Sequence, residues 1–284
     1  MQTVVTNRVI HGDCLEVLPR IADASVDLVY VDPPFNTGRV QRRERLRTIR
    51  DEEGGDRTGF MGKRYRTERV ARDPGFADRF EDYLAFLEPR LREAHRVLKP
   101  TGSFYFHIDY REVHYCKVLL DRIFGREAFL NEIIWAYDYG ARSKKRWPAK
   151  HDNILFYAKN PAKYHFDLSE VDRIPYMAPG LVGPEKAARG KLPTDTWWHT
   201  IVSPTGKEKL GYPTQKPLGI LRRIVRASCP KDGLVLDFFA GSGTTGAAAL
   251  ETGRNFLLVD KSAAAIEVMR RRFAELPVEF DVGE

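Results

Sequence analysis

The sequence predicts an α/β protein with a mostly parallel sheet that is covered by helices on both faces. Short apolar runs typical of buried strands alternate with segments in which apolar residues recur at helical spacing. Near the C-terminus, a glycine-rich turn joins one of these runs to a helix. Strands that alternate with helices indicate a parallel sheet.

The first predicted strand is 26–31, which Pro33 and Pro34 end, and the others are 103–108, 234–239 and a strand ending at Asp260. Helical spacing covers residues 78–98, 111–124, 217–228, 244–252 and 262–275. Pro89 is expected to kink the first of these helices.

Two segments interrupt the alternation. Residues 39–72 carry 12 Arg or Lys against 6 Asp or Glu and show no helical or strand period, so we expect a mobile basic loop. Residues 139–212 contain charge clusters and Pro-Gly breaks, which favour an irregular insertion. The expected organisation is two halves of one domain, 1–138 and 212–284, separated by an insertion over 139–211.

Composition limits the classes of function. The net charge of +7 favours a polyanionic partner, although a merely soluble basic protein would look the same. The sequence lacks an apolar stretch of about 18 residues and a signal-peptide pattern at its start, so we expect a cytoplasmic protein with no membrane partner. The three widely spaced cysteines argue against a metal site and against a disulfide framework.

The glycine loop is the first candidate site. Gly241, Gly243 and Gly246 match G-x-G-x-x-G between a strand and a helix, where backbone N–H groups can face an anion. Asp260, at the end of the next strand, could accept both hydroxyls of a ribose. A dinucleotide site, an S-adenosylmethionine site and a ligand-free turn all fit this pattern. Because only one clear strand follows the loop, the sheet is expected to have a permuted order.

The second candidate site is Asp32-Pro33-Pro34-Phe35, which directly follows a predicted strand. The Asp32 carboxylate and the Pro33 carbonyl can accept both hydrogens of an exocyclic amine and so favour a tetrahedral nitrogen as a methyl arrives. Phe35 offers a face on which a flipped base can stack. A rigid Pro-Pro turn without chemistry is the alternative.

The two motifs, in this order, resemble the β group of DNA amino-methyltransferases, as does Pro213-Thr214-Gln215-Lys216-Pro217. The resemblance implies a Rossmann-like methyltransferase fold with a circularly permuted sheet, the donor S-adenosyl-L-methionine and the product S-adenosyl-L-homocysteine. It implies cofactor contacts from Asp13, Cys14, Asp32, Thr214, Lys216, Asp237, Phe238, Ala240, Gly241, Ser242, Gly243, Thr244, Thr245 and Asp260. Among these, Asp13 would bind the adenine amino group, Lys216 the methionine carboxylate and Asp260 the ribose.

In the resembling family an Asp at position 32 is usual for adenine N6, and Ser for cytosine N4, so we expect an adenine-N6 enzyme acting on double-stranded DNA, with cytosine N4 as the alternative. Methylation of RNA or of a protein amide is a rival hypothesis, as is a nucleic-acid-binding module with a vestigial nucleotide site. A cognate restriction endonuclease and a homodimer are the partners that the resemblance suggests.

Two basic clusters are the candidate DNA contacts: Arg39, Arg42 and Arg43, and then Arg142, Lys144, Lys145 and Arg146 beside Trp147. A solvated linker and a solvated charged face are the alternatives. His107 and Asp109 end a predicted strand and could line the base pocket, but a histidine satisfied by its neighbours fits equally well. No catalytic role is assigned to them.

Overall fold

The computed structural model describes residues 7–41, 44–51, 53–54, 57–58, 62–72, 76–138, 142–203 and 206–282. The chain forms two compact units, one of Met1–Phe35 with Asp82–Glu284 and the other of Asn36–Glu81. The larger unit holds every element that the site described below uses.

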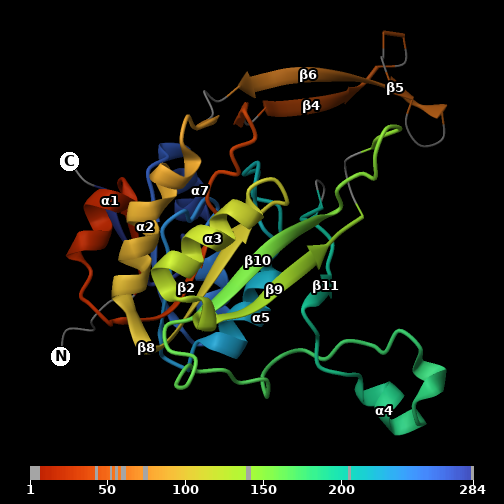
Figure 1. The fold of residues 1–284 in the computed structure, drawn as a ribbon. Helices are drawn as coiled ribbons and strands as arrows, with labels where there is room; N and C mark the ends of the chain where they lie inside the picture. The colour runs from red at the N-terminus through yellow and green to blue at the C-terminus, as the bar shows by residue number, and fades with distance from the viewer. Residues whose placement is uncertain are drawn as a thin grey trace. The chain divides into compact units, whose positions relative to one another are not determined.

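A nine-stranded sheet forms the centre of the larger unit (Figure 1). Its order is β11 (Thr196–Trp198), β9 (Phe129–Ala136), β10 (His151–Ala158), β8 (Leu98–Ile108), β2 (Val26–Val31), β12 (Leu234–Asp237), β13 (Asn255–Asp260), β1 (Arg8–His11) and β14 (Glu279–Val282). Among these described strands only β10 runs antiparallel to its neighbours, so the sheet is mixed but mostly parallel. The predicted fold class is therefore confirmed.

Helices cover both faces of this sheet. They are α1 (Cys14–Val17), α2 (Tyr83–Val97), α3 (Val113–Phe124), α5 (Leu218–Ser228), α6 (Thr244–Glu251) and α7 (Ala263–Arg272), with short 3-10 turns at Leu18–Arg20 and Arg126–Ala128. The short helix α4 (Pro184–Arg189) and the 3-10 turn Pro179–Leu181 lie away from the sheet, in the connection from β10 to β11 (Figure 1). Neighbouring residues of a strand point to opposite faces. Phe104 of β8 stacks on Phe124 of α3, whereas the Tyr105 hydroxyl lies 2.7 Å from Ser228 Oγ of α5, so α3 and α5 lie on opposite faces (Figure 1).

Polar caps set where the helices begin. The Asp82 side chain accepts a hydrogen bond from the Ala85 amide at 2.9 Å, so α2 starts at Tyr83 and not at 78 as predicted. Ser262 caps α7 in the same way. The other predicted helices are found within two residues of their expected starts.

The smaller unit corrects the prediction of an irregular loop over 39–72. It contains β4 (Glu44–Arg50), β6 (Arg64–Arg72) and β5 (Arg57–Thr58) in one sheet, and β3 (Arg39–Gln41) paired with β7 (Phe76–Asp78) in another. Both long strands carry an arginine at almost every second position. Because of these charges, the β-branched and aromatic residues between them form no apolar run, and the strands were not predicted.

The predicted insertion over 139–211 also needs correction, because its residues 151–158 form β10, between β8 and β9. The run NILFYA is as apolar as the predicted strands, but the basic cluster directly before it obscured the signal. A further strand, β14, follows the single strand that was expected after the glycine loop. None of the described helices is long and apolar enough to cross a membrane.

Candidate active site

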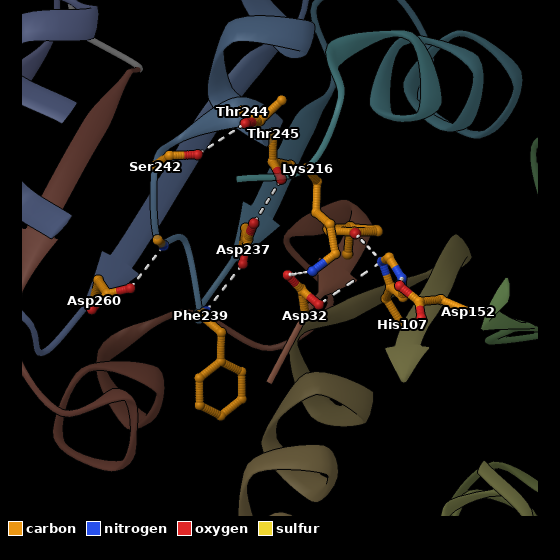
Figure 2. A network of polar contacts seen from close by, with 12 residues as sticks. Asp32, His107, Asp152, Lys216, Asp237, Phe239, Ser242, Thr244, Thr245 and Asp260 are labelled. Atoms are coloured by element: carbon orange, nitrogen blue, oxygen red, sulfur yellow. Dashed lines mark hydrogen bonds and ion pairs between the residues drawn. The ribbon is translucent and has the colours of Figure 1, made fainter. Parts of the chain in front are cut away.

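The carboxyl ends of the parallel strands bring together the residues of both predicted motifs (Figure 2). Asp32 follows β2, Asp237 ends β12 and Asp260 ends β13, and these three strands are neighbours in the sheet. Ligands of open α/β sheets bind at this edge. The arrangement brings residues that are about 200 positions apart in sequence into one site.

The glycine loop needs its glycines for two different reasons. Gly241 and Gly243 have φ values of +51° and +72°, which side chains with a Cβ rarely adopt. A Cβ on Gly246 would lie 2.8 Å from Leu258 Cδ1, so this glycine lets α6 pack closely on β13. The Arg272 guanidinium donates to the Ser242 carbonyl at 2.6 Å and ties the loop to α7. Ser242 Oγ and Thr244 Oγ1 are 3.0 Å apart.

Two carboxylates, the buried Asp237 and the half-buried Asp260, hold this loop in place. Asp260 accepts hydrogen bonds from the Gly241 amide at 2.7 Å and the Ser262 amide at 2.8 Å, and burial raises its pKa. Asp237 accepts from the Phe239 amide at 3.0 Å and from Thr245 Oγ1 at 2.6 Å. Burial, together with the nearby charges of Asp32 and Asp260, raises the pKa of Asp237 to about 7.

Asp13 is held by a buried arginine. It caps α1 by accepting from the Leu15 amide at 3.0 Å, and Arg90 Nη2 lies 3.3 Å from the same oxygen. Burial alone would raise the pKa of Asp13, but the amide and the nearby charges of Arg90 and Lys261 hold it below its usual value. Arg90 Nε also donates to Cys14 Sγ at 3.2 Å, and burial raises the pKa of this thiol to about 11.

Asp32 forms an ion pair on one side only. Lys216 Nζ lies 2.5 Å from Asp32 Oδ2 and 4.9 Å from the centroid of the Phe35 ring. Asp32 Oδ1 is buried and has no hydrogen-bond partner among the described residues. The Tyr83 hydroxyl donates to the Pro34 carbonyl at 2.5 Å and fixes the proline turn to α2. A buried unpaired acceptor costs free energy unless a ligand supplies the donor.

A polar network surrounds Asp32 on the side of β8 and β10 (Figure 2). His107 is fully buried, with its Nδ1 at 2.7 Å from the Tyr30 hydroxyl and its Nε2 at 3.3 Å from Asp152 Oδ2. The Tyr137 hydroxyl donates to Asp152 Oδ1 at 3.0 Å. Sequence reasoning missed Asp152 because strand β10 was not predicted, and Tyr137 because it follows β9, which was not predicted either. Tyr30 lies within a predicted strand, but its partner His107 is set by the pairing of β2 with β8, which no local pattern encodes.

The remaining predicted residues divide into buried and exposed groups. Phe238, Ala240 and Pro33 are buried, and Thr214 is exposed. The neighbouring Gln215 is buried: its Oε1 accepts from the Leu210 amide and its Nε2 donates to the Glu208 carbonyl, so it stabilises this segment.

The predicted DNA contacts lie in two places. The second basic cluster is exposed and lies between β9 and β10: Arg142, Lys144, Lys145 and Arg146. Arg39 begins β3, whereas Arg42 and Arg43 lie outside the described residues.

The sheet, the glycine loop and the unpaired Asp32 acceptor define an α/β enzyme of Rossmann-like fold with a ligand site at the carboxyl edge. Residues 26–271 match the family model described as DNA methylase, N6_N4_Mtase, so the chain belongs to the N6/N4 DNA methylase family. This family uses S-adenosyl-L-methionine as its methyl donor.

Relatives agree with this assignment. The chain is 30% identical to the DNA adenine methyltransferase YhdJ of Escherichia coli (strain K12), over 93% of this chain and 81% of that protein. It is 28% identical to the type II methyltransferase M.HpaI of Haemophilus parainfluenzae, over 93% and 73%. The cytosine-N4-specific PvuII DNA methyltransferase has a similar fold, with a TM-score of 0.63, 18% identity, and 94% and 86% coverage.

Proposed function

We propose that this protein transfers the methyl group of S-adenosyl-L-methionine to the exocyclic N6 of an adenine flipped out of double-stranded DNA. The observation that carries the proposal is Asp32 Oδ1, a buried acceptor without a hydrogen-bond partner among the described residues. Phe35 follows three positions later in the same turn. An exocyclic amine supplies the missing donor, and the Pro33 carbonyl is proposed as the acceptor of its second hydrogen.

The chain's residues fit the donor. The loop from Ala240 to Thr245 presents amide groups at the start of α6, where an anion is favoured. Asp13 remains about one third exposed and has a second oxygen for an amino group. The oxygens of Asp260 each already accept one amide, and a second lone pair on each remains for ribose hydroxyls.

Lys216 needs a modified role in this proposal. It was expected to pair with the methionine carboxylate, but in the structure its ammonium contacts Asp32 Oδ2 at 2.5 Å. We propose that Lys216 stands between the two groups and fixes the Asp32 carboxylate so that Oδ1 faces the amine. No covalent enzyme intermediate is required, since the amine attacks the methyl group directly.

The test compares the wild-type protein with Asp32→Asn and with Asp23→Asn, an exposed aspartate at the opposite end of β2. Nucleoside mass spectrometry of DNA incubated with S-adenosyl-L-methionine should show N6-methyladenine for wild type and Asp23→Asn. We expect Asp32→Asn to lose at least about 100-fold in rate, because its amide cannot accept at both oxygens. N4-methylcytosine as the sole product would overturn the choice of base, and absence of cofactor binding in calorimetry would overturn the methyltransferase proposal.

The cytosine-N4 alternative is kept because the structurally similar PvuII enzyme is described as cytosine-N4-specific. That similarity concerns the fold, whereas the relative of highest identity among those compared above is described as acting on adenine. A cognate restriction endonuclease is proposed from relatives described as type II methyltransferases.

A further inference from the structure

The buried His107 and the half-buried Asp152 form a pair next to Asp32 that the proposed transfer step does not use (Figure 2). His107 Nδ1 is 3.9 Å from Asp32 Oδ1, and His107 Nε2 is 3.3 Å from Asp152 Oδ2. The imidazole therefore lies between two carboxylates. Its ring also contacts the rings of Phe35 and Trp135, with centroid distances of 5.7 and 5.5 Å.

Asp152 decides which nitrogen of His107 carries the hydrogen. Burial alone would raise the pKa of Asp152, but the hydrogen bond from His107, the charge of Lys216 and the hydrogen bond from Tyr137 hold it below its usual value. An ionised carboxylate only accepts, so Nε2 must donate, and Nδ1 of the neutral ring keeps its lone pair. The Tyr30 hydroxyl at 2.7 Å then donates to Nδ1.

Methyl transfer releases a proton that needs an acceptor. As the nitrogen–carbon bond forms and the sulfur–carbon bond breaks, the nitrogen becomes positively charged, and one N–H bond must break with its electron pair returning to nitrogen. Asp32 Oδ1 accepts this hydrogen first. A proton that stayed there would break the ion pair between Asp32 and Lys216.

We propose that His107 takes the released proton from Asp32, and that Asp152 holds the ring in the tautomer that can do so. This inference rests on the proposed function. The gap of 3.9 Å between Asp32 Oδ1 and His107 Nδ1 must close by about 1 Å for an O–H···N hydrogen bond, while the Tyr30 hydroxyl turns away. The products are a neutral methylated amine and an imidazolium between the Asp32 and Asp152 carboxylates. His107 does not touch the amine: it acts through Asp32, and we therefore call it a positioning residue.

The charged and titratable groups that face His107 come from several elements. Tyr30 comes from β2, Asp32 from the turn after it and Asp152 from β10, and Tyr137, directly after β9, donates to Asp152. Protonation of His107 before turnover removes the acceptor. The transfer rate should therefore fall at acid pH, where a proton occupies Nδ1.

The main experiment measures single-turnover methylation of a DNA duplex, at saturating S-adenosyl-L-methionine, between pH 6 and pH 9. His107→Gln keeps a donor for Asp152 but has no basic nitrogen, so we expect a rate about 100-fold lower and loss of the acid-side inflection. Affinities for the cofactor and for DNA should stay within about threefold. The control His114→Gln removes an exposed histidine of α3 and should match wild type.

Asp152→Asn provides the second variant. Its amide stabilises the imidazolium less than a carboxylate does, so the acid-side inflection should persist but move to lower pH. Nitrogen NMR of the wild-type protein provides a readout that needs no variant: a neutral ring with the hydrogen on Nε2 is expected at pH 8.

The inference would be overturned by His107→Gln with an unchanged pH profile and a rate within about twofold of wild type. An Nδ1–H tautomer, or a permanently charged ring at pH 8, would overturn it as well. If the wild-type protein methylates no DNA, the proposed function fails instead, so the two failures are distinguishable.

Discussion

At the scale of single residues, the site contains three neighbouring carboxylates with different partners. Asp32 pairs with Lys216, Asp260 accepts two backbone amides, and Asp237 accepts one amide and one hydroxyl while only 2% exposed. No cation neutralises Asp237 in the part of the chain that the structure describes. The fold thus keeps this carboxyl in an environment that opposes its negative charge.

Asp237 should make stability depend on pH. Its pKa is about 7 when folded against 3.8 for the free group, so between these values the folded state binds more protons than the unfolded state. Wild-type stability should therefore fall as pH rises from about 4 to about 7. Asp237→Asn removes this loss, and its free energy of unfolding relative to wild type should rise by on the order of 1–3 kcal/mol between pH 5 and pH 8. Urea titrations at both pH values measure the free energies of unfolding. An equal difference between the variant and the wild type at the two pH values would contradict the prediction.

At the scale of elements, the glycine loop combines a left-handed backbone with close packing. Gly243 and Gly253 share a φ of +72°. A Cβ on Gly243 would lie 2.8 Å from Met269 Cγ and 3.1 Å from Phe273 Cε2, whereas one on Gly253 meets nothing within 4 Å. The two positions therefore separate backbone strain from steric overlap.

Alanine substitutions at Gly243 and Gly253 measure the free-energy costs of backbone strain and of steric overlap. Gly253→Ala should lower the free energy of unfolding by about 1–2 kcal/mol from backbone strain alone. Gly243→Ala should cost about 1–3 kcal/mol more, because Met269 and Phe273 must move. Chemical denaturation of both variants provides the comparison. Equal losses of stability in the two variants would show that α7 can move to accommodate the added methyl group without cost.

The sequence predicted the elements that have a local signal. Asp32, Asp237 and Asp260 each follow an apolar run, and the convergence of parallel strand ends places them at one edge. Asp152 and Tyr30 reach His107 across 45 and 77 residues, respectively, through strand pairing that no local pattern encodes. Because β10 is antiparallel to β8, its first residues lie at the same edge of the sheet. This direction follows from strand pairing and has no local signal in the sequence.

At the scale of the whole molecule, the net charge is +7, and part of the positive charge lies in a connection between two strands of the large sheet. The exposed residues Lys144, Lys145 and Arg146 lie in the connection from β9 to β10, and that connection leads directly into Asp152. Lysines and arginines that contact phosphates release counterions. We propose from this location that DNA lies across this edge of the sheet.

The salt dependence of binding tests this location. Replacing Lys144, Lys145 and Arg146 by Ala should flatten the slope of log K against log salt by about 2–3, since each phosphate contact contributes about 0.9. Lys186→Ala with Arg189→Ala, which removes exposed charges of α4, should leave the slope unchanged. Fluorescence anisotropy with a labelled duplex measures both, and an unaltered slope for the triple variant would contradict the location.

The place of β2 between β8 and β12 affects how the protein is made. The Leu234 amide donates to Asp27 Oδ2 across 207 residues, and β12 must pair with β2 before the glycine loop and Asp32 can meet. On the ribosome, β2, which precedes Asp32, is synthesised early, whereas its neighbour β12 is synthesised near the end of this sequence. Contacts of such long range form slowly, so methylation activity should begin only after the last quarter of these residues has been synthesised and folded.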